Sequence, residues 1–356
     1  SYLANYFNAG IAIFFMVVYI GNLKSVRFSF VEVTLLAIPL FWFFIGVAVN
    51  GINRHTFSDT FTSSFFAMLF SFVRSQEFQF DNQLQVKCAD WMHYGFFVSM
   101  AIYRIASLLG VKVFTVGITS IFFAFPLFVY FCLGMHRKFW FHMVLLVIAS
   151  KRGVLLAVLV AFFVWAKANR KINKRVQISI IVVILTVSAA VIFFSLTPER
   201  MSLAPQRLQP VLYKTMFINP FSKYNRILTD ARVLEILNAM RPLVADPIYL
   251  LIGKGPGYTY EFFDPFGLLL QGDRHNAHFS PVTIFTRYGV LYTILLYGLI
   301  LSTLFKNYRK MKRGKLSLSR QVLFFYCVAG FVNSFTAFTI YIDYLFIVAL
   351  GVLNAK

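Results

Sequence analysis

The sequence is poor in charged residues, and above all in acidic ones. Charged residues make up 13% of its 356 positions, and 13 Asp and Glu stand against 34 Lys and Arg. A soluble domain usually carries about a quarter of its residues as charged ones, so this composition excludes an ordinary soluble protein. Hydrophobic residues instead reach 59% and aromatic residues 19%. We therefore predict a polytopic membrane protein.

Cysteine is also scarce. The three cysteines, Cys88, Cys132 and Cys327, lie in or beside apolar segments and form no CxxC pair. Their spacing indicates neither a disulfide framework nor a metal site, so we expect buried free thiols. No metal ion and no cofactor is predicted.

The formal net charge is +21. In a soluble protein such a charge would favour nucleic acid as a partner, but in a membrane protein positive charges first report which loops face the cytoplasm. We therefore expect membrane lipids, and no nucleic acid, around this chain.

Apolar segments recur along most of the chain. Those long enough to be considered as crossings of the roughly 30 Å hydrocarbon layer are 2–19, 29–49, 56–73, 93–109, 113–133, 139–148, 154–165, 176–196, 282–305, 322–338 and 339–353. The more polar segment 74–91 is expected to be a loop or an interfacial helix. The predicted fold class is all-α, a polytopic helix bundle with about eleven crossings.

Two basic clusters orient the bundle. Residues 167–175 and 306–315 are rich in Lys and Arg and are placed in the cytoplasm by the positive-inside rule. The long polar segment between the two groups of crossings then lies on the outer face. Ser1 also falls outside, so we expect a first helix before it and about twelve crossings in the full protein. Three parts of one integrated domain follow: 1–196, the N-terminal transmembrane helices; 197–281, the large outer loop; and 282–356, the C-terminal transmembrane helices.

The outer loop contains one clear helix signal. Thr229 or Asp230 can cap a helix that runs to about Arg241, with Pro242 and Pro247 expected to end it. We predict a helical cap over the bundle.

Two of the six histidines stand together where this loop re-enters the membrane. His275 and His278 flank Asn276-Ala277, just before an apolar segment. An imidazole can accept a hydroxyl proton at neutral pH, so His275 is the first candidate for a general base. His278 is the second, with packing or orientation as its alternative role. Of the other histidines, His55 alone lies near the outer face.

Several arginines could hold an anionic group. Arg152 lies at the outer end of an apolar segment beside Gly153, and Arg226 and Arg232 lie before and on the loop helix. Arg104 lies within an apolar segment, where a charge is costly unless it is paired or hydrated. Snorkelling to lipid headgroups is the alternative for the outer arginines.

The glycine-rich segment Gly253-Lys254-Gly255-Pro256-Gly257 invites comparison with a phosphate-binding loop. It lacks the GxxxxGK[ST] spacing, and Pro256 removes one backbone donor. We therefore favour a turn that returns the loop to the membrane.

The order of these motifs resembles the O-antigen ligase and O-antigen polymerase superfamily of bacterial inner membranes. The matching residues are Ser150, Arg152, Gly153, Arg232, 253–257 with Tyr258, His275, Asn276 and 287–289 (Arg-Tyr-Gly). The resemblance covers residues 137–305, whereas the first 130 residues match only in being apolar.

The resemblance implies an integral-membrane glycosyltransferase of the GT-C-like class. Such an enzyme acts at the periplasmic face on undecaprenyl-pyrophosphate-linked glycans without a metal ion. Arg152 and Arg232 would hold the lipid pyrophosphate, with Arg226 and Arg104 as further candidates, and His275 or His278 would be the base. Asn276, Gly255, Gly257 and Tyr258 would support the site.

The acceptor separates the alternatives. A polymerase of O-antigen, capsular or exopolysaccharide repeats uses another lipid-linked glycan, with a chain-length regulator as a candidate partner, whereas a ligase uses the lipid A core. A flippase or transporter of lipid-linked sugar is a third possibility, although no repeated halves of the kind many transporters have are found in the sequence. The sequence favours the polymerase slightly and identifies neither sugar nor linkage.

Overall fold

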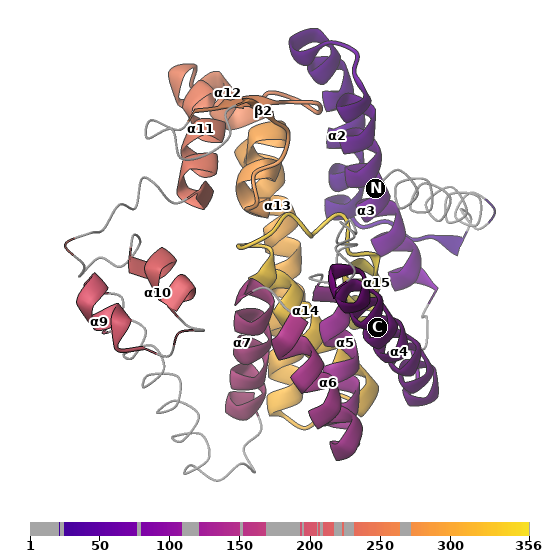
Figure 1. Cartoon of the computed structure of the whole chain (residues 1–356). Helices are drawn as coiled ribbons and strands as arrows, with labels where there is room; N and C mark the ends of the chain where they lie inside the picture. The colour runs from indigo at the N-terminus through magenta and orange to yellow at the C-terminus, as the bar shows by residue number, and fades with distance from the viewer. Residues whose placement is uncertain are drawn as a thin grey trace.

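The protein is mostly helical. The computed structural model describes residues 21, 25–76, 80–108, 121–149, 152–168, 193, 196–204, 206, 209–216, 223, 231–263 and 272–355. Its elements (Figure 1) are α2 (Phe30–Asn50), α3 (Arg54–Ser75), α4 (Asn82–Leu108), η2 (Ile121–Ala124), α5 (Phe125–Cys132), α6 (His136–Ala149), α7 (Arg152–Ala168), α9 (Pro198–Ser202), α10 (Gln209–Met216), α11 (Ala231–Ala245), α12 (Ile248–Ile252), β1 (Tyr260–Phe262), β2 (Gly272–Arg274), α13 (Ser280–Lys312), α14 (Leu318–Asn333) and α15 (Tyr344–Asn354).

Two of the described helices, α2 and α13, are long and apolar enough to cross a membrane. The expectation of about eleven crossings is not supported. Helix α7 has 17 residues and α15 has 11, and 17 residues rise about 26 Å, short of roughly 30 Å. Helices α3 and α4 are longer but contain polar stretches. The predicted crossings 2–19 and 176–196 lie outside the described residues.

Helix α3 turns its polar side chains inward. Its buried positions include Thr56, Asp59, Thr60, Ser63 and Ser64, which recur at helical spacing on one face. Polar residues on the inner face and apolar ones on the outer face are the pattern expected of helices surrounded by lipid.

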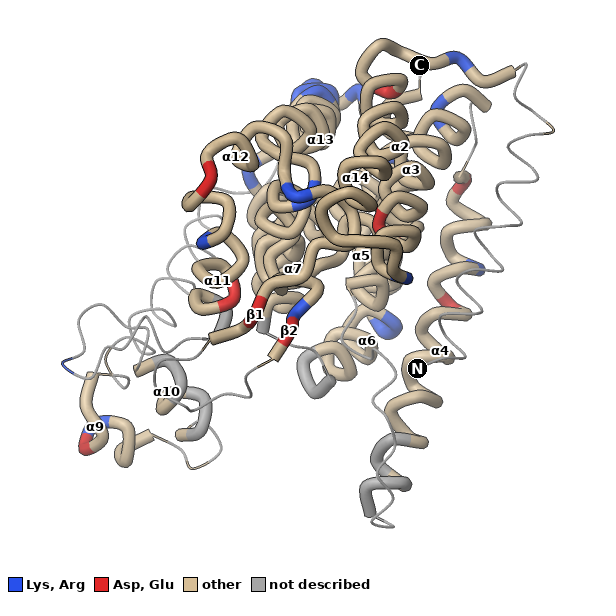
Figure 2. The backbone as a smooth tube through the Cα atoms, turned by 90° about the horizontal axis from the view of Figure 1, so that it is seen from above, with Lys and Arg blue, Asp and Glu red and all other residues tan. Residues whose placement is uncertain are grey.

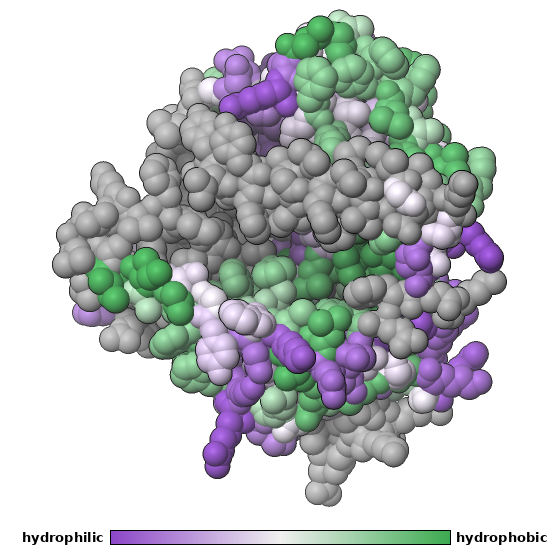
Figure 3. Space-filling view, turned by 90° about the vertical axis from the view of Figure 1, so that its right-hand side faces the viewer, coloured by the Kyte–Doolittle hydropathy of each residue, from purple (hydrophilic) through white to green (hydrophobic). Residues whose placement is uncertain are grey.

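Helix α2 shows the matching apolar exterior. Phe30, Phe41 and Phe44 are each more than 60% exposed, and in Figure 3 hydrophobic side chains gather at the top of the face, where α2 lies. Soluble monomers rarely expose contiguous apolar surface of this kind. The α2 surface is therefore suited to contact with lipid or with another apolar partner.

The start of each helix in this pair is capped. Ser29 and Glu32 form a capping box at α2, and the Asn53 side chain accepts from the backbone N–H groups of His55 and Thr56 at α3. Gly51, with φ of 74°, makes the turn between the helices. These caps fix where α3 begins and therefore where His55 and Asp59 lie.

The main core lies where α3, α5, α7, α13, α14 and α15 meet. It is built from aromatic and aliphatic side chains such as Phe66, Phe128, Tyr292, Phe325 and Leu350, all buried. In Figure 1, α13 and α14 run through the middle of the bundle, with α7 packed against α14.

The polar segment 74–91, expected to be a loop or an interfacial helix, is mostly helical. Most of it forms the first part of α4, which continues without a break into the apolar segment that follows. The Gln85 side chain donates to the backbone oxygens of Phe80 and Ser319 at 3.0 and 2.9 Å. These contacts tie the polar start of α4 to the beginning of α14.

The predicted outer loop has its own small core. Leu234, Leu243, Tyr258, Tyr260 and Phe262 form a second buried cluster that joins α11 to the hairpin of β1 and β2. The strands pair antiparallel, with Glu261 opposite Asp273. The two strands have three residues each, so the described residues remain mostly helical, as the predicted all-α class requires. Figure 2 shows the acidic positions of α11, β1 and β2 on this side of the molecule.

Helix α11 begins close to the expected position but runs further. It extends to Ala245, with Pro242 inside it, so the expectation that Pro242 ends the helix is wrong. The proline lies in the last turn. It removes one backbone hydrogen bond there, and the rest of the helix before it is unaffected. Pro247 does lie at a boundary, because it is the N-cap of α12.

Candidate functional site

The candidate site forms where α13 is interrupted. Gly289 lies within α13 but has φ of 74° and ψ of −176°, so the helix has a kink there. A kink frees carbonyl groups in the preceding turn, and these need other donors. The N–H groups of Lys254 and Gly255 donate to the carbonyls of Thr286 and Arg287 at 2.7 and 2.9 Å. The glycine-rich turn therefore completes the kink.

The three glycines of this turn are required by close backbone packing. Gly253, Gly255 and Gly257 have φ of 73°, 85° and 84°. A Cβ at Gly253 would lie 2.4 Å from the Arg287 backbone, and one at Gly255 would lie 2.6 Å from Gly46. Only glycine tolerates both the positive φ and these approaches.

The segment is a turn, as the sequence favoured, and its donors are already in use. The N–H groups of Gly253, Lys254 and Gly255 donate to backbone carbonyls. The N–H of Gly257 donates to Asp59 Oδ2 at 2.8 Å, and Pro256 has no N–H. No backbone donor remains for a phosphate cradle at these five positions.

Asp59 is the buried carboxylate of the site. It lies on the inward face of α3, and its side chain is 5% exposed. Besides Gly257, it contacts Arg287 Nη1 at 3.0 Å and His275 Nε2 at 3.1 Å. A buried charge is stable when it is paired and hydrogen-bonded, and Asp59 is both.

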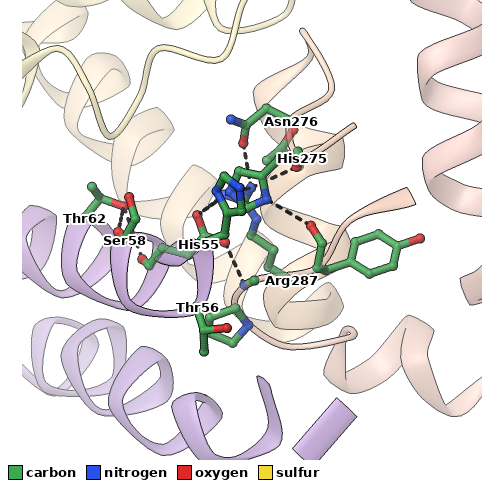
Figure 4. A network of polar contacts seen from close by, with 12 residues as sticks. His55, Thr56, Ser58, Thr62, His275, Asn276 and Arg287 are labelled. Carbon is green, nitrogen blue, oxygen red and sulfur yellow. Dashed lines mark hydrogen bonds and ion pairs between the residues drawn. The ribbon is translucent and has the colours of Figure 1, made fainter. Parts of the chain in front are cut away.

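Arg287 gathers the other groups around this carboxylate (Figure 4). Its Nη2 donates to the backbone oxygen of His275 at 3.0 Å and to Asn276 Oδ1 at 2.6 Å, and it lies 3.0 Å from His275 Nε2. The Arg287 side chain is 2% exposed. We call Asp59, His275, Asn276 and Arg287 the Arg287 cluster.

The contacts of His275 define its hydrogen positions. Its Nδ1 lies 3.2 Å from the backbone oxygen of Tyr258, and a carbonyl can only accept, so Nδ1 carries a hydrogen. In the neutral ring Nε2 then holds the lone pair and accepts from Arg287. If Nε2 is protonated, it donates to Asp59 instead. His275 is thus engaged on both sides of its ring.

A second imidazole stacks on His275. The ring of His55, from the start of α3, lies 3.9 Å from it between centroids, with 31° between the planes. Partial burial, and then the positive charges of His275 and Arg54, lower the pKa of His55. A neutral His55 avoids repulsion against the Arg287 cluster at neutral pH.

His278 belongs to a separate pair with α11. Its Nδ1 lies 3.0 Å from each carboxylate oxygen of Glu235, and its backbone N–H donates to Glu235 Oε2 at 3.1 Å. Tyr258 connects this pair to the Arg287 cluster, because its carbonyl accepts from His275 while its hydroxyl donates to the Ala239 carbonyl of α11 at 3.1 Å.

For the predicted arginines, the structure describes at most the position along the backbone. Arg152 begins α7, Arg232 lies in the first turn of α11 and Arg104 lies near the end of α4, but the side chains of all three lie outside what the structure describes. Arg226 also lies outside the described residues. Beside Arg152, a Cβ on Gly153 would lie 2.3 Å from the Thr336 hydroxyl, so that glycine allows α7 to pack against the residues after α14.

Four residues of the site were not among the sequence candidates: His55, Asp59, Glu235 and Arg287. Asp59 had a usable signal, since a carboxylate inside a predicted crossing is a functional hypothesis by default. Arg287 stood in the Arg-Tyr-Gly motif but was not given a role. Its motif neighbours also contribute: the Tyr288 hydroxyl donates to the Asp59 carbonyl at 3.1 Å, and Gly289 makes the kink.

The described residues contain no group of three or more His, Cys, Asp or Glu side chains arranged to hold a metal ion. Comparisons of the chain with protein-family models, with curated proteins and with solved structures find no match.

Proposed function

We propose that this chain is a glycosyltransferase of the bacterial inner membrane, one that polymerises undecaprenyl-pyrophosphate-linked glycan repeats at the periplasmic face. One observation carries the proposal. Three short motifs that support the resemblance are separated in sequence, yet Tyr258 contacts His275 and Arg287 contacts Asn276. Asp59 of α3 contacts one residue of each motif, namely Gly257, His275 and Arg287. If the three motifs matched the family only by chance, contacts among their residues in one polar site would not be expected.

The site chemistry suits this reaction. Attack of a sugar hydroxyl on the anomeric carbon expels a pyrophosphate, which is already a good leaving group. The protein must mainly supply a base and stabilise charge. Both histidines that flank Asn276-Ala277 contact a carboxylate that can stabilise an imidazolium. In the proposed enzyme Arg152 and Arg232 bind the pyrophosphate, since guanidinium groups form bidentate contacts with phosphate oxygens.

The proposed setting is a multi-pass chain with the outer loop in the periplasm. Its support is the apolar exterior of α2, the inward polar face of α3 and the basic clusters. The site lies near the N-terminal end of α13, whereas Lys306, Arg309, Lys310 and Lys312 lie near its C-terminal end. A helix of this length allows the two groups to face opposite sides of a membrane.

The test is a transfer assay with purified protein in the presence of EDTA. The substrates are synthetic undecaprenyl-pyrophosphate-linked oligosaccharides, supplied with and without lipid A core. We expect longer lipid-linked glycans without the core, and a rate that EDTA leaves unchanged. Product that forms only on lipid A core would identify a ligase, and no transfer to either acceptor would contradict the proposal.

The His275→Ala variant makes the site assignment specific. We expect it to lower turnover by about 10²-fold, the scale of a misplaced catalytic group, because it removes the imidazole that joins Asp59, Arg287 and Tyr258. Amounts of folded protein are compared by gel filtration in detergent. Unchanged turnover would exclude the Arg287 cluster as the active site.

A further inference from the structure

The two histidines of the site differ in how their rings are held. The His275 side chain is 16% exposed, and both its nitrogens contact protein groups. The His278 side chain is 48% exposed, and the hydrogen bonds of its ring both involve Nδ1. In the part of the chain that the structure describes, Nε2 of His278 has no hydrogen-bond partner. A group that takes a proton from substrate must present a lone pair to it.

Glu235 determines which nitrogen of His278 has that lone pair. An ionised carboxylate can only accept, so the short contacts from Nδ1 to both Glu235 oxygens place the hydrogen on Nδ1. Nε2 is then the basic nitrogen. Glu235 is itself held in place, because it also accepts the backbone N–H of His278 and its side chain is 8% exposed. The ring orientation is therefore fixed by two bonds to one carboxylate.

We propose that His278, oriented by Glu235, is the residue that accepts the proton of the attacking hydroxyl, and that His275 is a positioning residue. The inference rests on the proposed function and assigns the roles within its site. A carboxylate behind an imidazole fixes the tautomer and stabilises the imidazolium that forms. The Glu235–His278 pair has this arrangement with an exposed outer nitrogen, whereas His275 has its outer nitrogen against Arg287.

The proposed step is displacement of the pyrophosphate by the acceptor hydroxyl. The acceptor hydroxyl oxygen forms a bond to the anomeric carbon of the lipid-linked glycan while its proton passes to Nε2 of His278. The bond from that carbon to the pyrophosphate oxygen breaks, and the undecaprenyl pyrophosphate leaves with the electron pair. Glu235 stabilises the imidazolium until the proton is released to water or to the departing pyrophosphate.

His275 has a different task in this arrangement. Through Nδ1 it holds the Tyr258 carbonyl, and through Nε2 it contacts Asp59 and Arg287. Tyr258 also reaches α11 through its hydroxyl, and α11 carries Glu235. Loss of His275 therefore disturbs the position of the Glu235–His278 pair without removing its proton acceptor.

The test compares four variants in the transfer assay with the same lipid-linked oligosaccharides. We expect His278→Ala to lower kcat by about 10² to 10⁴ with little change in KM. Free imidazole should restore part of that rate, because the vacated position is exposed. Glu235→Gln should lower kcat by about tenfold or more with KM unchanged, since an amide keeps the hydrogen bond but not the charge. His275→Ala should lower kcat, and free imidazole should not restore the rate of this variant. His136→Ala, at an exposed histidine of α6, is the matched control and should retain full activity.

The outcomes separate the two proposals. A wild-type protein that transfers no glycan overturns the proposed function. An active wild type with a fully active His278→Ala variant, or imidazole rescue of His275→Ala alone, overturns only the assignment of His278. If His278→Ala does not fold, His278→Gln replaces it, since its amide can still donate to Glu235, and full activity of that variant overturns the assignment equally.

Discussion

At the scale of single residues, the site depends on a buried ion pair. Asp59 and Arg287 are both almost fully excluded from solvent, and such a pair is stable only because each member has further partners. Gly257 and His275 supply them to Asp59, and the backbone and side-chain oxygens of His275 and Asn276 supply them to Arg287. The stability of the Asp59–Arg287 pair therefore depends on the glycine-rich turn 253–257 and on His275 and Asn276, as well as on α3 and α13.

Removing one member of this pair should be strongly destabilising. We expect Asp59→Ala to lower the free energy of unfolding by about 3–5 kcal/mol, because it leaves the Arg287 charge buried without its partner. The double variant Asp59→Asn/Arg287→Met should lose less than Asp59→Ala, since no unpaired charge remains. Thermal unfolding in detergent measures both.

Asp273→Ala is the control for this comparison. Asp273 is exposed on β2 and lies opposite Glu261, so its loss should change the melting temperature little. Equal melting temperatures for Asp59→Ala and Asp273→Ala would show that the Asp59–Arg287 pair does not hold the site together.

The sequence predicted half of this residue-level picture. His275, Asn276 and the glycine turn were identified because they lie in one short segment of recognisable chemistry. Asp59 and Glu235 contact the same site from α3 and α11, and partners so distant in sequence carry no spacing signal. Arg287 was part of a matching motif but had no role assigned, since its sequence position does not distinguish a buried ion pair from a contact with lipid headgroups.

At the scale of elements, the kink in α13 is what brings the motifs together. The apolar segments predicted the positions of most described helices. The pattern of hydrophobic residues along a segment is a stronger signal for a helix than the identity of any single residue. They could not predict that Gly289 interrupts one of them, because an isolated glycine is compatible with a continuous helix. The three-residue strands β1 and β2 were likewise too short to give an alternating pattern.

Two glycines of the same helix test the kink. Gly289→Ala places a Cβ 2.0 Å from the Leu251 carbonyl at φ of 74°, so we expect a large fall in melting temperature, reflecting strain of about 1–3 kcal/mol together with the clash. Gly298→Ala has nothing within 4 Å and should stabilise the helix by about 0.5–1 kcal/mol. A Gly289→Ala protein as stable as Gly298→Ala would mean that the kink is not needed for folding.

At the scale of the whole molecule, the polar site and the basic positions occupy opposite ends of α13. The helix is kinked at Gly289, but its uninterrupted part, 290–312, is still about 35 Å long, enough to exceed the hydrocarbon layer. Gln85 of α4 contacts Ser319 beyond the basic end, so the polar start of α4 lies there too. At each end of α13, segments that are distant in sequence lie together. The proposed membrane must therefore lie between the Arg287 cluster at one end and the basic residues at the other.

Cysteine labelling tests that placement. In a background where Cys88, Cys132 and Cys327 are replaced by serine, Thr259→Cys and Lys315→Cys each introduce one thiol at an exposed position. A membrane-impermeant maleimide should label Thr259→Cys in intact spheroplasts, because the outer loop faces the periplasm in the proposed orientation. Lys315→Cys should react only after permeabilisation, since Lys-rich and Arg-rich short loops remain in the cytoplasm. Labelling of both from outside would contradict a membrane between the two ends of α13, and the reverse pattern would place the Arg287 cluster at the cytoplasmic face, where an acceptor on the outer surface could not reach His278.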